Sequence, residues 1–312
     1  MTILNAIIQG IVQGLTEFLP VSSSGHLGIS QHILGVTEDN LFFNVMLHIG
    51  TLVAVCIFYH KLIWRLIKAF FGMIKDIFTG KFSWKNMDED RNMLMMIIIG
   101  LIPLFLLFLP IPGTDMKVKD LADVLAGPKY FIVIGIWLVV TSVLLLLGSL
   151  VSRKGTNMAH SSDDVGGRSR MNVVDAICVG VTQCVAAIFP GLSRSGSTLA
   201  AGQLRGVNKQ AALDYTFVLG TPAIIAAAAL ELKDALEAPE GISIEIAPLI
   251  IGMVVAAIVG YLSIWLFKLL LKTDKMIVFI LYTAVVGIAV IVISLIEAQS
   301  GVNMFTGAPI PV

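Results

Sequence analysis

Long runs of apolar residues, with few polar interruptions, make up most of this 312-residue chain. A helix that crosses the hydrocarbon core of a bilayer needs roughly 20 such residues. Six runs reach that length, and each predicts a transmembrane helix. They cover about 41–60, 93–111, 130–151, 211–230, 248–270 and 275–297, and the connection 61–92 is expected to be a loop.

Two further apolar stretches, roughly 1–36 and 171–207, are broken in the middle. Pro20 and residues 22–25 interrupt the first, and the polar run 190–198 interrupts the second. Neither half of either stretch is long enough to cross a bilayer. We therefore expect two re-entrant helical hairpins, whose non-helical backbone lies against protein or a water-filled cavity.

The two broken stretches indicate an internal duplication. At an offset of 170 positions, Gly10, Gln13 and Pro20 recur as Gly180, Gln183 and Pro190. Each half of one integral membrane domain (1–312) then holds a hairpin and three spans, in repeats of about 1–151 and 171–297. Because three is odd, the halves must be inverted. The expected fold class is all-α: a polytopic membrane protein with six transmembrane helices and two re-entrant hairpins in an inverted-topology repeat.

Composition and charge support a membrane location. Hydrophobic residues make up 57% of the chain and charged residues 13%, against about 25% charged in soluble domains. The net charge is zero, so nucleic acid is not an expected partner. Sixteen Lys and Arg residues lie on one side of the predicted spans and four on the other. This asymmetry places both termini outside the cytoplasm, and the hairpin tips then meet near the midplane.

The first tip carries more polarity than a helix break requires. Gln13 and Glu17 are four residues apart and share a helix face, and a carboxylate in an apolar segment is a functional candidate. The following residues are suited to holding an anion and activating a hydroxyl: Ser22, Ser23, Ser24, Gly25 and His26. The alternative is a structural helix break lined with capping groups. Elsewhere, His48 is expected to serve packing and Asp214 to lie at the interface.

The second tip is built around Arg194. This residue keeps its charge in the membrane and needs an anion, which is either Glu17 or a bound phosphate. Hydroxyl and backbone N–H groups surround it, as in phosphate sites: Gly191, Ser193, Ser195, Ser197 and Thr198. The alternative is a structural Glu17–Arg194 ion pair that locks the hairpins together. Both interpretations can hold, since such a pair can open to admit phosphate.

Both tips resemble those of one family, the bacterial undecaprenyl-diphosphate phosphatases of the bacitracin-resistance type. Gln13 to Glu17 matches its first motif, which is Glu or Gln followed four positions later by Glu. Pro20 to His26 matches a proline-led Ser-Ser-x-Gly-His stretch, and Pro190 to Thr198 matches Pro-Gly-x-Ser-Arg-Ser-x-x-Thr at every fixed position. The resemblance covers essentially the whole chain.

The resemblance implies hydrolysis of a polyprenyl diphosphate lipid, undecaprenyl diphosphate, to undecaprenyl phosphate and inorganic phosphate. This recycles the carrier lipid for cell-wall synthesis and confers bacitracin resistance. The implied setting is the bacterial plasma membrane, surrounded by membrane lipid, with the site facing the extracytoplasmic side. The implied cofactor is a divalent cation, magnesium or calcium; a homodimer is left open.

The expected mechanism has four catalytic residues. Arg194 clamps the phosphates and stabilises developing charge; Ser23 is the candidate nucleophile, with His26 as base or acid. Glu17 orients His26 or helps to hold the metal, and His26 or an activated water stays open as the attacking group. Substrate binding is expected from Gln13, Ser22, Ser24, Gly25, Gly191, Ser193, Ser195 and Thr198. A rival class, a lipid or phosphate transporter or flippase, would use the same anion site without a nucleophile.

Overall fold

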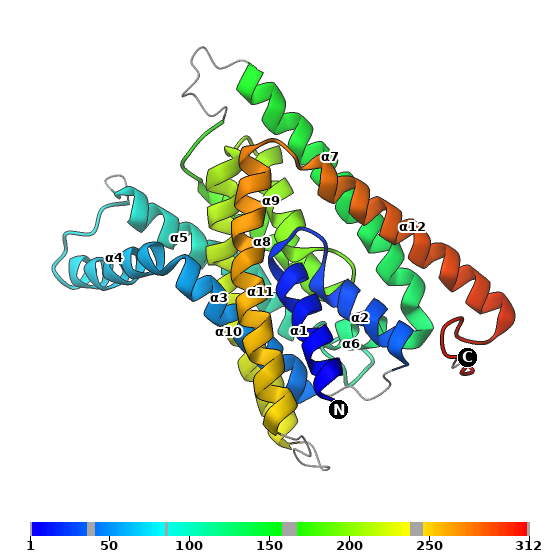
Figure 1. Cartoon of the computed structure of the whole chain (residues 1–312). Coiled ribbons are helices and arrows are strands. Elements are labelled where there is room, and N and C mark those ends of the chain that lie inside the picture. Colours follow the sequence, from blue (N-terminus) through cyan, green and yellow to red (C-terminus); the bar gives the residue numbers. More distant parts are fainter. Residues whose placement is uncertain (1, 36–40, 85–86, 158–166, 238–245, 311–312) are drawn as a thin grey trace.

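The computed structural model describes residues 2–35, 41–84, 87–157, 167–237 and 246–310, and within these ranges it is helical, with only isolated β-bridges. Figure 1 shows a central group of helices from which α4 and α5 extend on one side, and α7 and α12 on the other. The predicted stretch 1–36 and the predicted loop 61–92 include residues 1, 36, 85 and 86, which lie outside the described part. The helices are α1 (Ile3–Phe18), α2 (Ser23–Leu34), α3 (Leu41–Phe58), α4 (His60–Phe78), α5 (Glu89–Leu101), η2 (Ile102–Phe108), α6 (Asp120–Ala126), η3 (Pro128–Tyr130), α7 (Phe131–Asn157), α8 (Val173–Ile188), α9 (Arg194–Leu204), α10 (Lys209–Glu237), α11 (Ile246–Lys272) and α12 (Ile277–Ser300).

The predicted spans correspond to helices of the structure. Five are long and apolar enough to cross a membrane: α5 continued by η2, α7, α10, α11 and α12. The predicted span 41–60 coincides with α3, which meets that criterion only together with α4, and the chain bends by 84° between the two. The chain is therefore an all-α, multi-pass membrane protein, as the sequence predicts.

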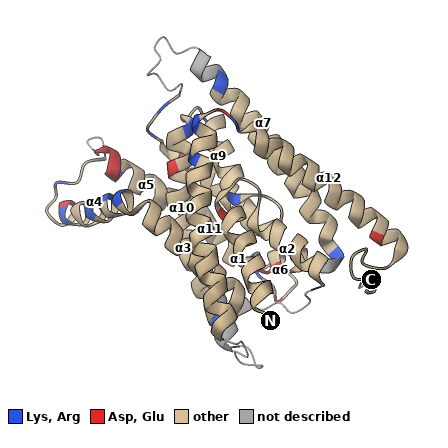
Figure 2. Cartoon of the chain, viewed as in Figure 1, with Lys and Arg blue, Asp and Glu red and all other residues tan. Residues whose placement is uncertain are grey.

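The connection 61–92 was expected to be a loop, and this expectation is wrong for its first half. Residues 60–78 form α4, and Figure 2 shows Lys and Arg residues spaced along this helix. The high charge of the segment suggested a solvated loop. The apolar residues between the charges recur at the helical period, however, and such a pattern forms an amphipathic helix.

The two broken stretches form two helical hairpins, α1–α2 and α8–α9. The first arms, α1 and α8, both have 16 residues and begin and end 170 positions apart, which matches the offset of the sequence repeat. The second arms have 12 and 11 residues, so every arm is shorter than a span requires. The inversion of one half relative to the other stays a prediction.

Close contacts at glycine residues hold both hairpins against neighbouring helices. In α1, a methyl group at Gly14 would lie 2.8 Å from the carbonyl oxygen of Ala256 in α11, so only glycine lets the two backbones approach this closely. At the second tip Gly191 has φ = 96° and packs against the Ile134 backbone of α7. That dihedral angle and that space both require glycine. The tips are therefore fixed by α11 and α7.

Candidate active site

The first tip is a tight turn that exposes a helix start. After α1 ends, Ser22 adopts φ = 74°, a backbone conformation that non-glycine residues rarely hold outside functional sites. Its hydroxyl accepts a hydrogen bond from the Gly25 N–H at 3.2 Å and caps α2. Ser23, the first residue of α2, is thereby directed back toward Glu17 near the end of α1.

In the second tip a serine also caps the second helix of the hairpin, but the neighbouring hydroxyl groups have other partners. Ser193 caps α9 by accepting a hydrogen bond from the Gly196 N–H at 3.1 Å, and its own N–H donates to the Thr141 hydroxyl of α7 at 3.0 Å. Ser195 donates to the Leu19 carbonyl of the first hairpin at 3.0 Å. The two tips are therefore in direct contact, as the sequence predicts.

The Glu17 carboxylate is the centre of the site. Its Oε1 accepts from the Arg194 guanidinium in an ion pair, and its Oε2 accepts from the Ser23 hydroxyl at 2.7 Å and from the Gln13 side-chain amide at 3.0 Å. The Glu17 side chain is 4% exposed and the Arg194 side chain 25%. A buried carboxylate is thus satisfied by a cation and two donors, while the guanidinium keeps an open side.

Helix α10 forms a wall of this site. Its Gly220 lies directly against the Arg194 guanidinium, so any side chain there would overlap the cation. On α3, the Nδ1 of His48 is 2.9 Å from the Asn44 carbonyl of the same helix, so this side chain is hydrogen-bonded within α3.

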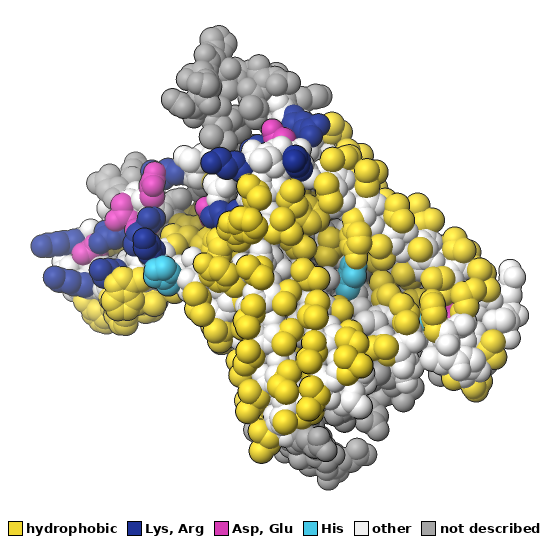
Figure 3. Space-filling model, viewed as in Figure 1, with side chains coloured by type: hydrophobic (Ala, Val, Ile, Leu, Met, Phe, Trp, Pro, Cys, Tyr) yellow, Lys and Arg dark blue, Asp and Glu magenta, His cyan; other side chains and the backbone are white. Residues whose placement is uncertain are grey.

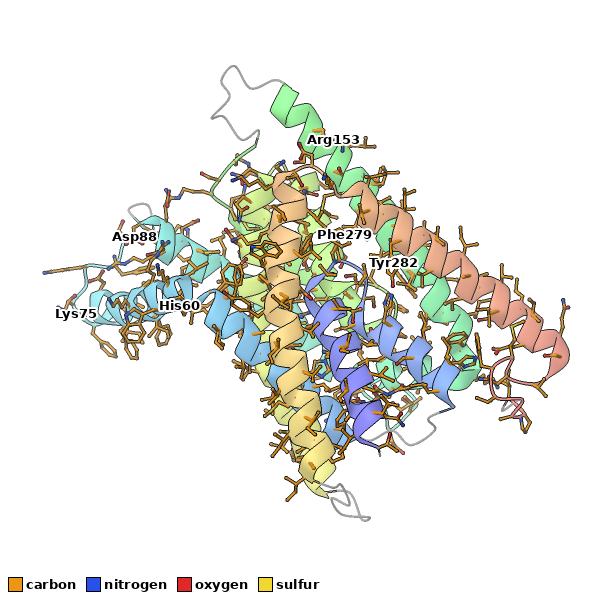
Figure 4. The ribbon with its side chains drawn as sticks, viewed as in Figure 1. His60, Lys75, Asp88, Arg153, Phe279 and Tyr282 are labelled. Atoms are coloured by element: carbon orange, nitrogen blue, oxygen red, sulfur yellow. The ribbon has the colours of Figure 1, made fainter. Side chains whose placement is uncertain are left out.

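His26 is held apart from Ser23. Its Nδ1 lies 2.8 Å from the Ser22 carbonyl, so this nitrogen carries the proton, and its Nε2 then accepts from the Tyr282 hydroxyl of α12 at 2.8 Å. The two rings are stacked, with centroids 5.6 Å apart; Tyr282 is labelled in Figure 4. Both ring nitrogens are engaged away from the Ser23 hydroxyl, which bonds Glu17 instead.

The predicted site residues thus divide into two groups. Gln13, Glu17, Ser23 and Arg194 are joined by direct hydrogen bonds. In the second tip the Thr198 hydroxyl donates to the Arg194 carbonyl at 2.7 Å. The Ser193 and Ser195 hydroxyls lie 3.3 Å from each other. Gly25 and Gly191 are buried, their Cα region forming the contact between the tips, and Ser24 is exposed beside Ser22.

Sequence reasoning missed two residues, Thr141 and Tyr282. Thr141 accepts from the Ser193 N–H and lies 3.1 Å from the Gly191 carbonyl. Tyr282 is 256 positions from His26. Both lie within apolar spans and carry no local motif, so only the packing of α7 and α12 against the hairpins identifies them.

The donor set suits a hard divalent cation in combination with a phosphate. Within the described ranges no group of three or more His, Cys, Asp or Glu side chains could hold a metal by itself. The Gln13 Oε1 is buried without a hydrogen-bond partner among the described residues, and it lies beside the Glu17 carboxylate. Mg²⁺ binds through one or two protein oxygens together with substrate phosphates, and these two side chains offer such oxygens.

The fold and the site define a class of protein: a multi-pass α-helical membrane protein in which two hairpins bring a carboxylate, a hydroxyl and a guanidinium together. A model of the family described as Bacitracin resistance protein BacA matches residues 6–289. The chain belongs to this family.

Three curated relatives of this chain carry the name undecaprenyl-diphosphatase. The chain is 39% identical to the protein of Alkaliphilus metalliredigens, over 95% of this chain and 100% of the relative. It is 36% identical to the protein of Methanosphaera stadtmanae, over 95% and 99%, and 34% identical to that of Halothermothrix orenii, over 94% and 99%. The family resemblance read from the two tips is therefore confirmed over nearly the full length.

Proposed function

We propose that this protein hydrolyses undecaprenyl diphosphate to undecaprenyl phosphate and inorganic phosphate, and so recycles the carrier lipid of cell-wall synthesis. The observation that carries the proposal is the convergence of Ser23 and Arg194 on one buried carboxylate, Glu17, from hairpins far apart in the chain. A nucleophile, a base and a phosphate clamp are the parts that phosphoryl transfer needs. The relatives' names point to the same reaction, and they give no support to the transporter alternative.

Substrate binding would begin with an exchange of partners at Arg194. In the free protein the guanidinium neutralises Glu17. The diphosphate offers this guanidinium a more highly charged, bidentate partner, and when Arg194 turns to the phosphates Glu17 loses its cation. The Glu17 Oε1 is then open to the divalent cation, while its Oε2 keeps the contact with the Ser23 hydroxyl. The structural ion pair and the phosphate clamp are thus two states of the same residue.

The transfer step would use the contact between Ser23 and Glu17. The Ser23 Oγ attacks the terminal phosphorus as its proton passes to the Glu17 Oε2, 2.7 Å away. The new Oγ–P bond replaces the bond to the bridging oxygen, and undecaprenyl phosphate leaves with the electron pair of that bond. Water then attacks the phosphoserine, releases inorganic phosphate and restores the Ser23 hydroxyl. Arg194 stabilises the charge that develops on the phosphoryl oxygens in both steps.

A divalent cation, magnesium or calcium, would be held by Glu17 and Gln13 together with the substrate phosphates. It would supply charge neutralisation on the phosphoryl oxygens. The role of Gln13 in this proposal is to offer a neutral oxygen to the cation and an amide N–H to Glu17.

The setting proposed for the reaction is the bacterial plasma membrane, with the site reached from the extracytoplasmic side. The support is the distribution of Lys and Arg, which are concentrated in the connections α3–α5, α7–α8 and α11–α12, as is typical of cytoplasmic connections. Membrane lipid then surrounds the spans and supplies the substrate laterally. A homodimer is compatible with this arrangement.

The decisive experiment is phosphate release by the purified protein in detergent, with undecaprenyl diphosphate as substrate and with or without chelator. The enzyme releases phosphate in the absence of any second compartment, whereas a transporter does not. We expect turnover that chelator abolishes and that added magnesium or calcium restores. Bound substrate without phosphate release would overturn the proposed function.

A further inference from the structure

Helix α4 leaves the helical body sideways and carries an unneutralised row of lysines. Lys61, Lys68 and Lys75 follow one another at intervals of seven residues, which keeps them on one helix face with a drift of only about 20° per interval. All three are exposed, and none forms an ion pair with another described residue. Figure 3 shows the resulting line of basic side chains along the edge of the molecule.

Two ion pairs fix the orientation of α4 against α5. Arg65 makes a bidentate contact with Asp90, with its shortest distance at 2.6 Å, and Arg91 bonds Asp76 at 2.9 Å. Asp76 and Asp90, the acidic residues in these two ion pairs, are therefore bonded to arginines and not to the three lysines. The three lysines remain as uncompensated positive charge on a helix that cannot rotate freely.

The surface of α4 next to the lysine row is aromatic: Trp64, Phe71 and Phe78 each follow one of the three lysines by three positions, and the Lys68 ammonium lies over the Trp64 ring. Trp64, Phe71 and Phe78 are 58%, 64% and 86% exposed, which is far more aromatic surface than a solvated helix carries. Figure 3 shows hydrophobic surface below basic side chains on the projecting part of the molecule. A helix with these adjoining basic and aromatic surfaces lies in the plane of a membrane interface.

An apolar groove runs beneath α4. It has a volume of about 410 Å³ and is lined by α4, α5 and α10, including Ile67, Phe70, Ile97, Val218 and Pro222. That volume is within the range of sites that hold small ligands, about 300–1,000 Å³. The groove lies on the side of α10 away from Gly220, and so away from Arg194, because residues 218 and 222 point opposite to residue 220 on a helix.

We propose that α4 and this groove form a binding site for an anionic phospholipid of the cytoplasmic leaflet. The lysine row binds the headgroup, and an acyl chain lies in the groove beneath. Charge complementarity selects the ligand: the cytoplasmic leaflet carries anionic lipids that attract basic segments at its surface. The apolar groove beneath the lysine row can hold the acyl chain of such a lipid. An acidic soluble protein has no acyl chain to occupy this groove.

The test measures which lipid reaches Trp64 in proteoliposomes. Phosphatidylglycerol or phosphatidylcholine, each with brominated acyl chains and at equal mole fraction, serves as quencher. The Trp64 signal is the difference between each protein and its Trp64→Phe counterpart. We expect stronger quenching by the brominated phosphatidylglycerol, and a loss of this preference at high salt, where charges are screened beyond about 3 Å.

Two double variants test the lysines with matched charge. K61Q/K75Q leaves Lys68 in its contact with Trp64, and K272Q/K275Q removes two exposed lysines from the α11–α12 turn on the same side. We expect the first variant to lower the preference about fivefold per lysine, the equivalent of about 1 kcal/mol each, and the second to leave it unchanged. Equal quenching by both lipids in the unmodified protein, or equal loss in both variants, would overturn the site.

Ile67→Asp tests the groove separately from the headgroup contact. A carboxylate in the groove opposes an acyl chain, so we expect weaker quenching by both brominated lipids while phosphate release continues. Unchanged quenching in this variant would show that the chain lies elsewhere. Absence of any Trp64 quenching in the unmodified protein would mean that α4 does not contact lipid and would refute the proposal.

Discussion

The two hairpin tips are both rich in hydroxyl groups, but they direct them at different partners. In the first tip Ser23 donates to the Glu17 carboxylate. In the second tip Ser195 donates to the Leu19 carbonyl and Thr198 to the Arg194 carbonyl. The hydroxyls of the second tip thus add hydrogen bonds to backbone carbonyls around the helix break, and none of them bonds the Glu17 carboxylate.

This difference separates a reacting tip from a supporting tip. The second hairpin holds one guanidinium in place, and its other polar residues stabilise the turn that presents it. The first hairpin presents a hydroxyl, a carboxylate and an imidazole. If this division is correct, substitutions at chemically similar residues of the two tips have effects that differ by orders of magnitude.

The largest effect is expected for Arg194, the one residue of the second tip that faces the reacting group. Arg194→Ala should lower kcat/KM for undecaprenyl diphosphate by about 10³-fold or more, as for other arginines that stabilise a transferring phosphoryl group. Arg194→Lys keeps the charge but loses the bidentate geometry. Its activity should lie between that of the unmodified protein and that of Arg194→Ala. Turnover near that of the unmodified protein in the folded Ala variant would remove Arg194 from the mechanism.

The next largest effect is expected for Glu17. Glu17→Gln keeps the shape of the side chain but removes the base and the charge that faces Arg194, and general-base catalysis is worth about 10²–10⁴-fold. Phosphate release at saturating magnesium measures the loss, which separates it from weaker metal binding. Rates close to normal would reduce Glu17 to a structural partner of Arg194.

Ser23 and Ser195 form the sharpest matched pair. Ser23→Ala removes the attacking oxygen and its proton transfer to Glu17, and should lower kcat by at least about 10²-fold. Ser195→Ala loses one hydrogen bond to the backbone, which should lower the free energy of unfolding by about 1 kcal/mol and leave kcat within a few-fold. Steady-state kinetics and thermal unfolding of both variants measure the contrast. Retained activity in Ser23→Ala would transfer the attack to water.

The sequence was sufficient to predict the spans, the two hairpins and the contact between their tips, because each rests on a long pattern. A run of about 20 apolar residues is long enough to cross a bilayer as a helix. A lone arginine in an apolar segment, such as Arg194, needs a nearby anion. Patterns of this kind do not show which of several hydroxyls is free. Ser23 lies one position and Ser195 two positions after a capping serine, and only the packing of the tips separates their roles.

Two other features were not predicted, for different reasons. Helix α4 was taken for a loop because its lysines and arginines raise its polarity, although its apolar residues recur at the helical period. Tyr282 lies in an apolar span with no motif around it, and its contact with His26 depends on how α12 packs beside α2. Contacts between distant segments of this kind come from tertiary structure alone.

The smallest effect is expected at Tyr282, which positions His26 and does not contact the Ser23–Glu17 pair. Tyr282→Phe keeps the stacked ring but removes the hydroxyl that donates to the His26 Nε2. Because His26 takes no part in the proton transfer from Ser23 to Glu17, we expect kcat to fall by only a few-fold, through a small change in the orientation of the first tip, with KM little changed. Tyr282→Ala also loses the ring and should fall further. Tyr261→Phe, on lipid-facing α11, is the matched control, since that ring packs on Phe58. If both Phe variants behave alike, Tyr282 has no part in orienting the imidazole, and His26 serves the first tip only as a structural residue.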